Sequence, residues 1–382
     1  MMTETPHPSQ RPHLAAVIED RFYEAAGWLL RRVGWRPRME TYSGYGSPRR
    51  VRVLARVLLA PPGRVAADNA YRAGRRGFRH YLTVPAPHRR VLVQVGGAQQ
   101  VVHSDRAGYV DVQVDVPEDP PLPPGWQRAR LSDAGAPTAA ERAAEPVRAP
   151  TPEDSADAPL LIIDADTRFG VISDIDDTTM VTSVPRPLLA AWNTFVRHSS
   201  KRRAVPGMPE LYRRLGKAHP ESPFVYLSTG AWNTAATLRA FLARNAYPPG
   251  PLLLTDWGPT MTGWFRSGQA HKDASLELLM SWFPHVRWLL VGDDGQHDSG
   301  IYARAVERRP DQVAAVAIRR LRPAEQVLAG NPPDGGATAG PEGSHLEGAG
   351  GRAAVPTVSG VDGHELAERL AEVPGVLGVP GS

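Results

Sequence analysis

The sequence predicts an α/β protein: a doubly wound parallel sheet within residues 159–322, preceded by a small antiparallel β-sandwich at 39–117. Two patterns predict this fold class. In the later region, continuous apolar runs alternate with helix-like stretches, which is typical of a parallel sheet covered on both faces. In the earlier region, apolar and polar residues alternate, and turns rich in Gly, Pro or Asp separate the runs.

The composition narrows the chemistry and the cell compartment. The chain has 382 residues, enough for two domains, and contains no cysteine, so disulfides, thiolate metal sites and a cysteine nucleophile are excluded. No apolar run approaches the roughly 20 residues that cross a bilayer, and the first residues lack an export signal pattern. We therefore expect a cytoplasmic protein and leave open a peripheral contact at the inner membrane surface.

The positive charge does not indicate a nucleic-acid partner. The net charge is +4, but only three of the basic residues are lysines, and the arginines are scattered over every segment without a dense run. A nucleic-acid surface usually concentrates its basic residues on one face or in one run. We therefore expect no nucleic acid and keep anionic surfaces and substrates open.

The regions before the α/β domain each have a distinct pattern. Residues 1–38 contain apolar positions at helical spacing over 14–34, followed by arginines. They predict an amphipathic helix that either docks on the body of the protein or lies on a membrane surface. The sandwich strands are expected at 51–59, 78–84, 90–97, 99–105 and 108–116.

The segments on either side of the α/β domain look irregular. Residues 118–158 are rich in Pro, Ala and charge and predict a linker, whereas 323–382 predict a mostly disordered tail with a short helix near 363–373. We expect removal of this tail to leave the melting temperature unchanged.

Within the α/β domain the elements are expected to alternate regularly. The predicted strands are 168–174, 223–228, 251–255, 286–292 and 312–319, and the predicted helices are 186–198, 207–218, 231–244, 271–282 and 298–308. Once these elements are placed, little or no room remains for a cap domain. An open site of this kind suits a bulky substrate, and basic residues at 197–203 are candidates for contact with lipid.

Acidic and hydroxyl residues stand where the predicted strands end. Asp174, Asp176, Asp177 and Thr178 follow the first strand, Ser228 and Thr229 end the second, and the fourth ends in Asp293, Asp294 and Asp298. Lys272 opens a later helix. Since ligands of an open parallel sheet bind beyond the carboxyl ends of its strands, these groups should meet at one edge. Clustered carboxylates need a cation, and oxygen ligands favour magnesium (Mg2+). A lysine and hydroxyls beside them suit a phosphate, so the pattern predicts phosphoryl chemistry.

The ordered set of DIDDT, Ser228, Lys272 and GDDGQHD resembles the haloacid dehalogenase superfamily of phosphatases. More closely, FGVISDIDDT, VYLSTGAWN and VGDDGQHDSGIYA resemble the fungal actin-patch phosphatidate phosphatase family and its bacterial relatives. The resemblance is strong over 168–320 and weaker for the GYGS stretch at 44–47 and the β region. It implies a haloacid-dehalogenase-like fold and a magnesium-dependent phosphomonoesterase that forms an aspartyl-phosphate on phosphatidate-like lipid.

The resemblance also implies a role for each site residue. Asp174 would be the nucleophile and a magnesium ligand. Asp176 would protonate the leaving oxygen and later take a proton from the attacking water, and its backbone carbonyl would help hold magnesium. Thr178 would support Asp176, and Ser228 and Thr229 would bind the phosphate. Lys272 would neutralise charge on the nucleophile and the phosphate. Asp293 would bind the metal, and Asp298 would orient the lysine or a metal-bound water. Asp294 departs from the family pattern and competes with Asp293 as a metal ligand.

Two other functions stay open. A phosphatase of the same fold would act on a protein or nucleotide phosphate, and a non-catalytic membrane or protein adaptor would keep only the fold. The complete set of Asp174, Asp176, Ser228, Lys272 and Asp293 argues against the adaptor. His271 and His297 adjoin stronger candidates and are expected to have no catalytic role.

Overall fold

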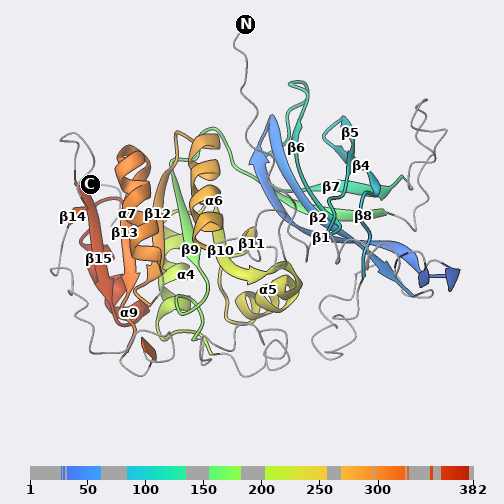
Figure 1. Ribbon diagram of the computed structural model, residues 1–382. Coiled ribbons are helices and arrows are strands. Elements are labelled where there is room, and N and C mark those ends of the chain that lie inside the picture. The colour runs from blue at the N-terminus through green and yellow to red at the C-terminus, as the bar shows by residue number, and fades with distance from the viewer. Residues whose placement is uncertain are drawn as a thin grey trace, which may run out of the picture.

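The computed structural model contains two sheets that lie side by side (Figure 1). The description covers residues 27, 29–30, 32–61, 84–134, 155–181, 203–255, 268–295, 297–322, 325–326, 345–346 and 354–377. Most of the predicted N-terminal helix, the predicted helix 186–198, the basic residues 197–202 and most of the predicted strand 78–84 lie outside these ranges. Within them, no helix is long and apolar enough to cross a membrane.

The first sheet has eight strands and is mainly antiparallel. Its hydrogen-bonded order is β3-β2-β1-β8-β7-β4-β5, and β6 pairs with β2. The strands are β1 (Arg36–Ser47), β2 (Arg50–Ala60), β3 (Val84–Pro85), β4 (Arg90–Val95), β5 (Ala98–His103), β6 (Tyr109–Asp115), β7 (Gly125–Asp133) and β8 (Ser155–Ile162). Valines and leucines of alternate positions are buried together, as the period-2 pattern predicts.

For this region one prediction is not confirmed and two need correction. The described strands are joined in one sheet, so a sandwich of two separate sheets is not confirmed. The predicted linker 118–158 contains β7 and the start of β8, and β8 pairs with β1 in parallel. Pro and Ala around these strands concealed them, and the β1–β8 pairing joins segments too distant for a local pattern to show. Residues 36–38 belong to β1 rather than to the N-terminal helix.

The second sheet has the order β11-β10-β9-β12-β13-β15-β14. Its strands are β9 (Phe169–Asp174), β10 (Phe224–Ala231), β11 (Leu252–Thr255), β12 (Arg287–Asp293), β13 (Val313–Arg319), β14 (His345–Leu346) and β15 (Val355–Gly360). All neighbouring pairs are parallel except β14–β15. The predicted α/β fold class is confirmed, and the five predicted strands of this domain agree with β9 to β13 within a few residues.

The strand order reverses between β9 and β12. From β9 the chain proceeds to β10 and β11 on one side, then returns to β12 and proceeds to β13 on the other. The helices are α4 (Met208–Ala218), α5 (Ala235–Arg244), α6 (Gly268–Trp282), α7 (Asp298–Arg308) and α9 (Gly363–Ala371), with short 3-10 turns η4 (Trp232–Thr234) and η5 (Pro310–Gln312). Right-handed crossovers then place the helices of the first half, α4 and α5, on one face of the sheet and those of the second half, α6 and α7, on the other. In Figure 1, α6 and α7 lie in front of the sheet and α4 lies behind it.

The prediction of a mostly disordered tail is wrong for residues 354–377. Strand β15 pairs with β13, and helix α9 packs on this edge of the sheet next to α4. Leu366 and Leu370 of α9 are fully buried, and Asp362 caps the helix by accepting hydrogen bonds from the backbone of His364 and Glu365. The predicted short helix near 363–373 agrees with α9, whereas the overall Gly and Pro content hid strand β15 and the packing of both elements on the core.

Aromatic residues join the two sheets. Tyr42 of β1 packs on Trp232 with ring centroids 4.4 Å apart, and Tyr45 lies against Trp282 and Phe283. Tyr45 is fully buried and belongs to the hydrophobic core of the second sheet. Strand β1 therefore contributes to both domains and fixes the first sheet beside the edge formed by β11.

Candidate active site

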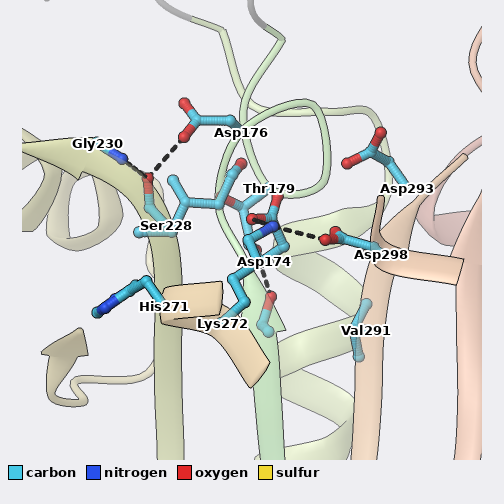
Figure 2. A network of polar contacts seen from close by, with 12 residues as sticks. Asp174, Asp176, Thr179, Ser228, Gly230, His271, Lys272, Val291, Asp293 and Asp298 are labelled. Atoms are coloured by element: carbon cyan, nitrogen blue, oxygen red, sulfur yellow. Dashed lines mark hydrogen bonds and ion pairs between the residues drawn. The ribbon is translucent and has the colours of Figure 1, made fainter. Parts of the chain in front are cut away.

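The predicted site residues meet at the carboxyl edge of the second sheet, where the strand order reverses. Strand β9 ends at Asp174, the neighbouring strand β12 ends at Asp293, and α7 begins at Asp298. Figure 2 shows Lys272 of α6 between Asp174 and Asp298. Such a reversal point is where open α/β sheets bind ligands.

Lys272 links two of the acids. Its Nζ donates hydrogen bonds to Asp174 Oδ1 and to Asp298 Oδ1, both at 2.6 Å, and all three side chains are buried. Burial alone would lower the pKa of Lys272, but the charges of Asp174 and Asp298 outweigh it and raise this pKa above its ordinary value. The ammonium group is therefore charged at neutral pH.

One ammonium group does not neutralise the acids around it. Carboxylate oxygens of Asp174, Asp293 and Asp298 all lie within 4.8 Å of one another. Burial raises the pKa of Asp174 and of Asp293 well above the ordinary value, and the neighbouring carboxylates raise both further, against the opposing charge of Lys272. The site thus carries more negative charge than its protein partners stabilise.

Oxygens without protein partners mark where a cation fits. Asp174 Oδ2, Asp293 Oδ2 and Asp298 Oδ2 are buried, and none of them has a hydrogen-bond partner among the described residues. An unpaired buried carboxylate oxygen is costly, whereas a hard divalent cation prefers oxygen ligands of this kind. These three residues therefore fit a hard metal cation.

The structure separates Asp293 from Asp294. Asp293 Oδ1 accepts a hydrogen bond from the backbone N–H of Gly295 at 2.7 Å, and its other oxygen lies in the acidic group. Asp294 Oδ1 instead accepts one from the backbone of Leu321 at 2.8 Å, and burial raises its pKa. The expectation that Asp294 competes for the metal needs correction, because its carboxylate braces the strand end rather than joining the acids.

Asp176 points to the other side of the site. Ser228 Oγ donates to Asp176 Oδ2 at 2.7 Å and accepts from the backbone N–H of Gly230 at 2.9 Å. Asp176 Oδ1 is buried without a hydrogen-bond partner among the described residues, and its carboxylate lies outside the three-acid group. The Asp176 carboxylate is thus placed apart from the three-acid group of Asp174, Asp293 and Asp298, as an acid or base would be.

The remaining candidates differ in their placement. Thr178 Oγ1 is buried and has no hydrogen-bond partner in the described part of the chain, so it does not support Asp176 by a hydrogen bond. Thr229 is partly exposed beside Ser228. His271 Nε2 contacts the carbonyl of Leu253, and in Figure 2 its ring points away from the acids. His297 is exposed.

Two features of the site were not found from the sequence. Gly292 lets α7 approach β12, because a Cβ atom there would lie 2.7 Å from Asp298 Oδ2 and 2.7 Å from the ring of Tyr302. Arg319, at the end of β13, donates to the carbonyl of Asp177 at 2.6 Å. A glycine directly before an acidic pair and one arginine among many gave no local signal of these contacts.

Fold and site together define an α/β domain with a buried group of acids and a lysine at the carboxyl edge of its parallel sheet. Residues 169–320 match the family model described as the catalytic domain of phosphatidate phosphatase APP1. This match confirms, for these residues, the resemblance found in the sequence.

A curated relative shows how far the match extends. Phosphatidate phosphatase APP1 of Saccharomyces cerevisiae is 28% identical over 152 residues, which are 40% of this chain. The matched residues span only 26% of that relative. The residues matched by the family model, 169–320, exclude the first sheet of this chain.

Similarity to solved structures is weak. A carbohydrate acetylesterase from Xanthomonas citri is 9% identical with a TM-score of 0.24, over 75% of this chain and 68% of that one. EndoBT-3987 from Bacteroides thetaiotamicron is 7% identical with a TM-score of 0.20, over 74% of this chain and 77% of that one. Scores this low carry no argument.

Proposed function

We propose that this protein is a magnesium-dependent phosphatase that hydrolyses a phosphomonoester of phosphatidate-like lipid through an aspartyl-phosphate intermediate, on a haloacid-dehalogenase-like domain. The observation that carries the proposal is the buried group of Asp174, Asp293 and Asp298, bridged by Lys272 and beside Asp176. The family match at residues 169–320 supports the lipid substrate.

The site residues divide the chemistry among them. One carboxylate oxygen of Asp174 would attack phosphorus while the bond from phosphorus to the leaving oxygen breaks. Asp176 would give a proton to that leaving oxygen and then take one from the water that hydrolyses the acyl phosphate. Lys272 would hold Asp174 in its attacking orientation and stabilise negative charge on the phosphoryl group.

A magnesium ion would be held by Asp174, Asp293 and Asp298 and would neutralise charge on the carboxylates and the phosphate. Ser228 would hold Asp176 until a phosphate oxygen arrives and would then donate to the phosphate, with Thr229 next to it. Such a protein would work in the cytoplasm and reach phosphatidate by peripheral contact with the inner surface of the membrane.

A substrate panel tests the proposal. Phosphate release would be measured with and without magnesium on phosphatidate, lysophosphatidate, a nucleoside monophosphate and a phosphopeptide. Magnesium-dependent release that is fastest from phosphatidate supports the proposal. Faster release from the nucleotide or the peptide would favour the alternative of a phosphatase that acts on a nucleotide or protein phosphate. No release from any substrate would contradict catalysis.

A further inference from the structure

The loop that follows β9 carries the two acids of the proposed mechanism, and other parts of the chain hold it in place. Asp177, next to Asp176, has a φ of 57°, in the left-handed region that non-glycine residues seldom adopt. Its backbone N–H donates to the carbonyl of Met180 at 2.8 Å and closes a tight turn. A turn of this kind persists only when its surroundings fix it.

The Asp177 carbonyl is held by a buried guanidinium group. Arg319 is 2% exposed, and its Nη1 donates to this carbonyl at 2.6 Å. The carbonyl of Arg319 accepts from the backbone N–H of Asp294 at 3.0 Å. One residue therefore joins the loop that carries Asp176 to the loop that follows Asp293.

The C-terminal segment 354–377 and Glu325 fix the guanidinium group itself. Arg319 Nη2 donates to both carboxylate oxygens of Glu325, at 2.9 and 2.8 Å, and its Nε donates to the carbonyl of Val361 at 3.3 Å. Strand β15 pairs with β13 up to Arg319 and Gly360. The planar guanidinium group of Arg319 donates to acceptors on three residues, Asp177, Glu325 and Val361, and is therefore held in one orientation. A lysine cannot reproduce this arrangement.

We propose that Arg319 is a positioning residue of the catalytic loop. By holding the Asp177 carbonyl it keeps the backbone of Asp174 and Asp176 in the reactive arrangement. The C-terminal segment thus acts on catalysis through this guanidinium group as well as on stability. This inference rests on the proposed phosphatase function for its kinetic consequences, whereas the tether itself is a property of the fold.

Arg320 provides a matched control. It also anchors the C-terminal segment, since its Nη2 contacts Glu365 Oε1 at 3.0 Å, but among the described contacts it has none to the catalytic loop. For Arg319→Ala, we expect kcat to fall about tenfold or more while KM changes by less than about threefold. For Arg320→Ala, we expect kcat to stay within about twofold of wild type. Guanidinium ion at a non-denaturing concentration should restore part of the kcat of Arg319→Ala, whereas sodium chloride of equal ionic strength should not.

Hydrogen exchange of the amides at 175–180 separates this inference from the proposed function. Exchange there should be faster in Arg319→Ala than in wild type and unchanged in Arg320→Ala, whether or not any substrate is hydrolysed. Equal kcat in the two variants, or loop exchange unaffected by Arg319→Ala, would overturn the inference. An inactive wild-type enzyme would contradict the phosphatase proposal, and the exchange result alone would then decide whether the tether exists.

Discussion

Asp174 is the residue on which the proposed chemistry depends most directly. In Asp174→Asn the side chain keeps its shape, but an amide does not attack phosphorus, so turnover should fall about 100-fold or more, a loss of about 2.7 kcal/mol in transition-state stabilisation. Because burial and neighbouring acids raise the pKa of Asp174, removing its charge also relieves repulsion, and the metal-free variant should melt no lower than wild type. Phosphate release and thermal melting measure the two effects. Retention of more than about a hundredth of the wild-type rate would exclude covalent catalysis at this residue.

The raised pKa values of Asp174 and Asp293 predict how pH changes stability. Their ordinary value is 3.8, and an acid whose pKa is raised by folding binds protons more readily in the folded state. The stability of the metal-free protein should therefore decrease as pH rises from about 4 toward the raised values. Magnesium and protons compete for the same oxygens, so the increase in melting temperature on adding magnesium should grow over this range. Melting curves at several pH values measure it, and an increase that is independent of pH would contradict a metal on these acids.

At the scale of single residues, the sequence predicted which polar residues stand at the ends of strands but not which contacts hold those residues in place. Asp174, Ser228, Lys272 and Asp293 were found because each follows an apolar run or opens a helix, and parallel strands bring such positions together. The position of Asp294 was left open, because adjacent carboxylates have equal chemistry in a sequence and differ only in direction. Arg319 escaped notice because its function depends on partners far away in the chain.

The helix α7 and the strand β12 meet closely enough to depend on one glycine. In Gly292→Ala the added methyl group would lie 2.7 Å from Asp298 Oδ2 and the Tyr302 ring, so α7 must shift. We expect a loss of about 1–3 kcal/mol in stability together with a fall in kcat, since Asp298 would move away from Lys272. Gly300→Ala in the same helix is the control, because the nearest atom there is Arg304 Nη1 at 3.6 Å. That variant should gain up to about 1 kcal/mol. Denaturant unfolding and phosphate release measure the two effects. Equal stability and equal kcat in the two variants would contradict this explanation.

The composition of residues 323–382 indicated the short helix α9 but not that this helix packs on the core. Leu366 of α9 is fully buried, with a relative solvent exposure of 0%. Leu366→Ala should therefore destabilise the protein by about 2–5 kcal/mol through the cavity it leaves. Val361, which is 37% exposed, is the control, and Val361→Ala should change stability by no more than about 0.5 kcal/mol. Chemical unfolding measures both, and a similar small effect of the two substitutions would show that the segment adds little to stability.

At the scale of the whole molecule, local patterns predicted the α/β domain well and the first sheet less well. Strands β9 to β13 and helix α7 follow from continuous apolar runs and helical spacing, which are local properties. The parallel pairing of β1 with β8, and the extension of the second sheet by β15, join segments that are distant in the sequence. Neither pairing leaves a local signal.

The aromatic contacts between the two sheets predict that they unfold together. Tyr45 lies on β1 but is buried in the core of the second sheet, where its ring is 5.8 Å from that of Trp282 and 6.3 Å from that of Phe283. Wild type should therefore unfold in a single calorimetric transition. Tyr45→Ala leaves a cavity at this junction and should cost about 3–5 kcal/mol, so that the first sheet separates at a lower temperature and two transitions appear.

Trp126 offers a control for that prediction, because it is an aromatic residue of the first sheet, on β7, that is 42% exposed to solvent. Trp126→Ala should lower stability less and preserve the single transition. Because Tyr42 packs on Trp232, just after the strand that supplies Ser228, uncoupling the sheets should also lower kcat. Two transitions in wild type would show instead that the sheets are independent and that β1 contributes nothing to the active site.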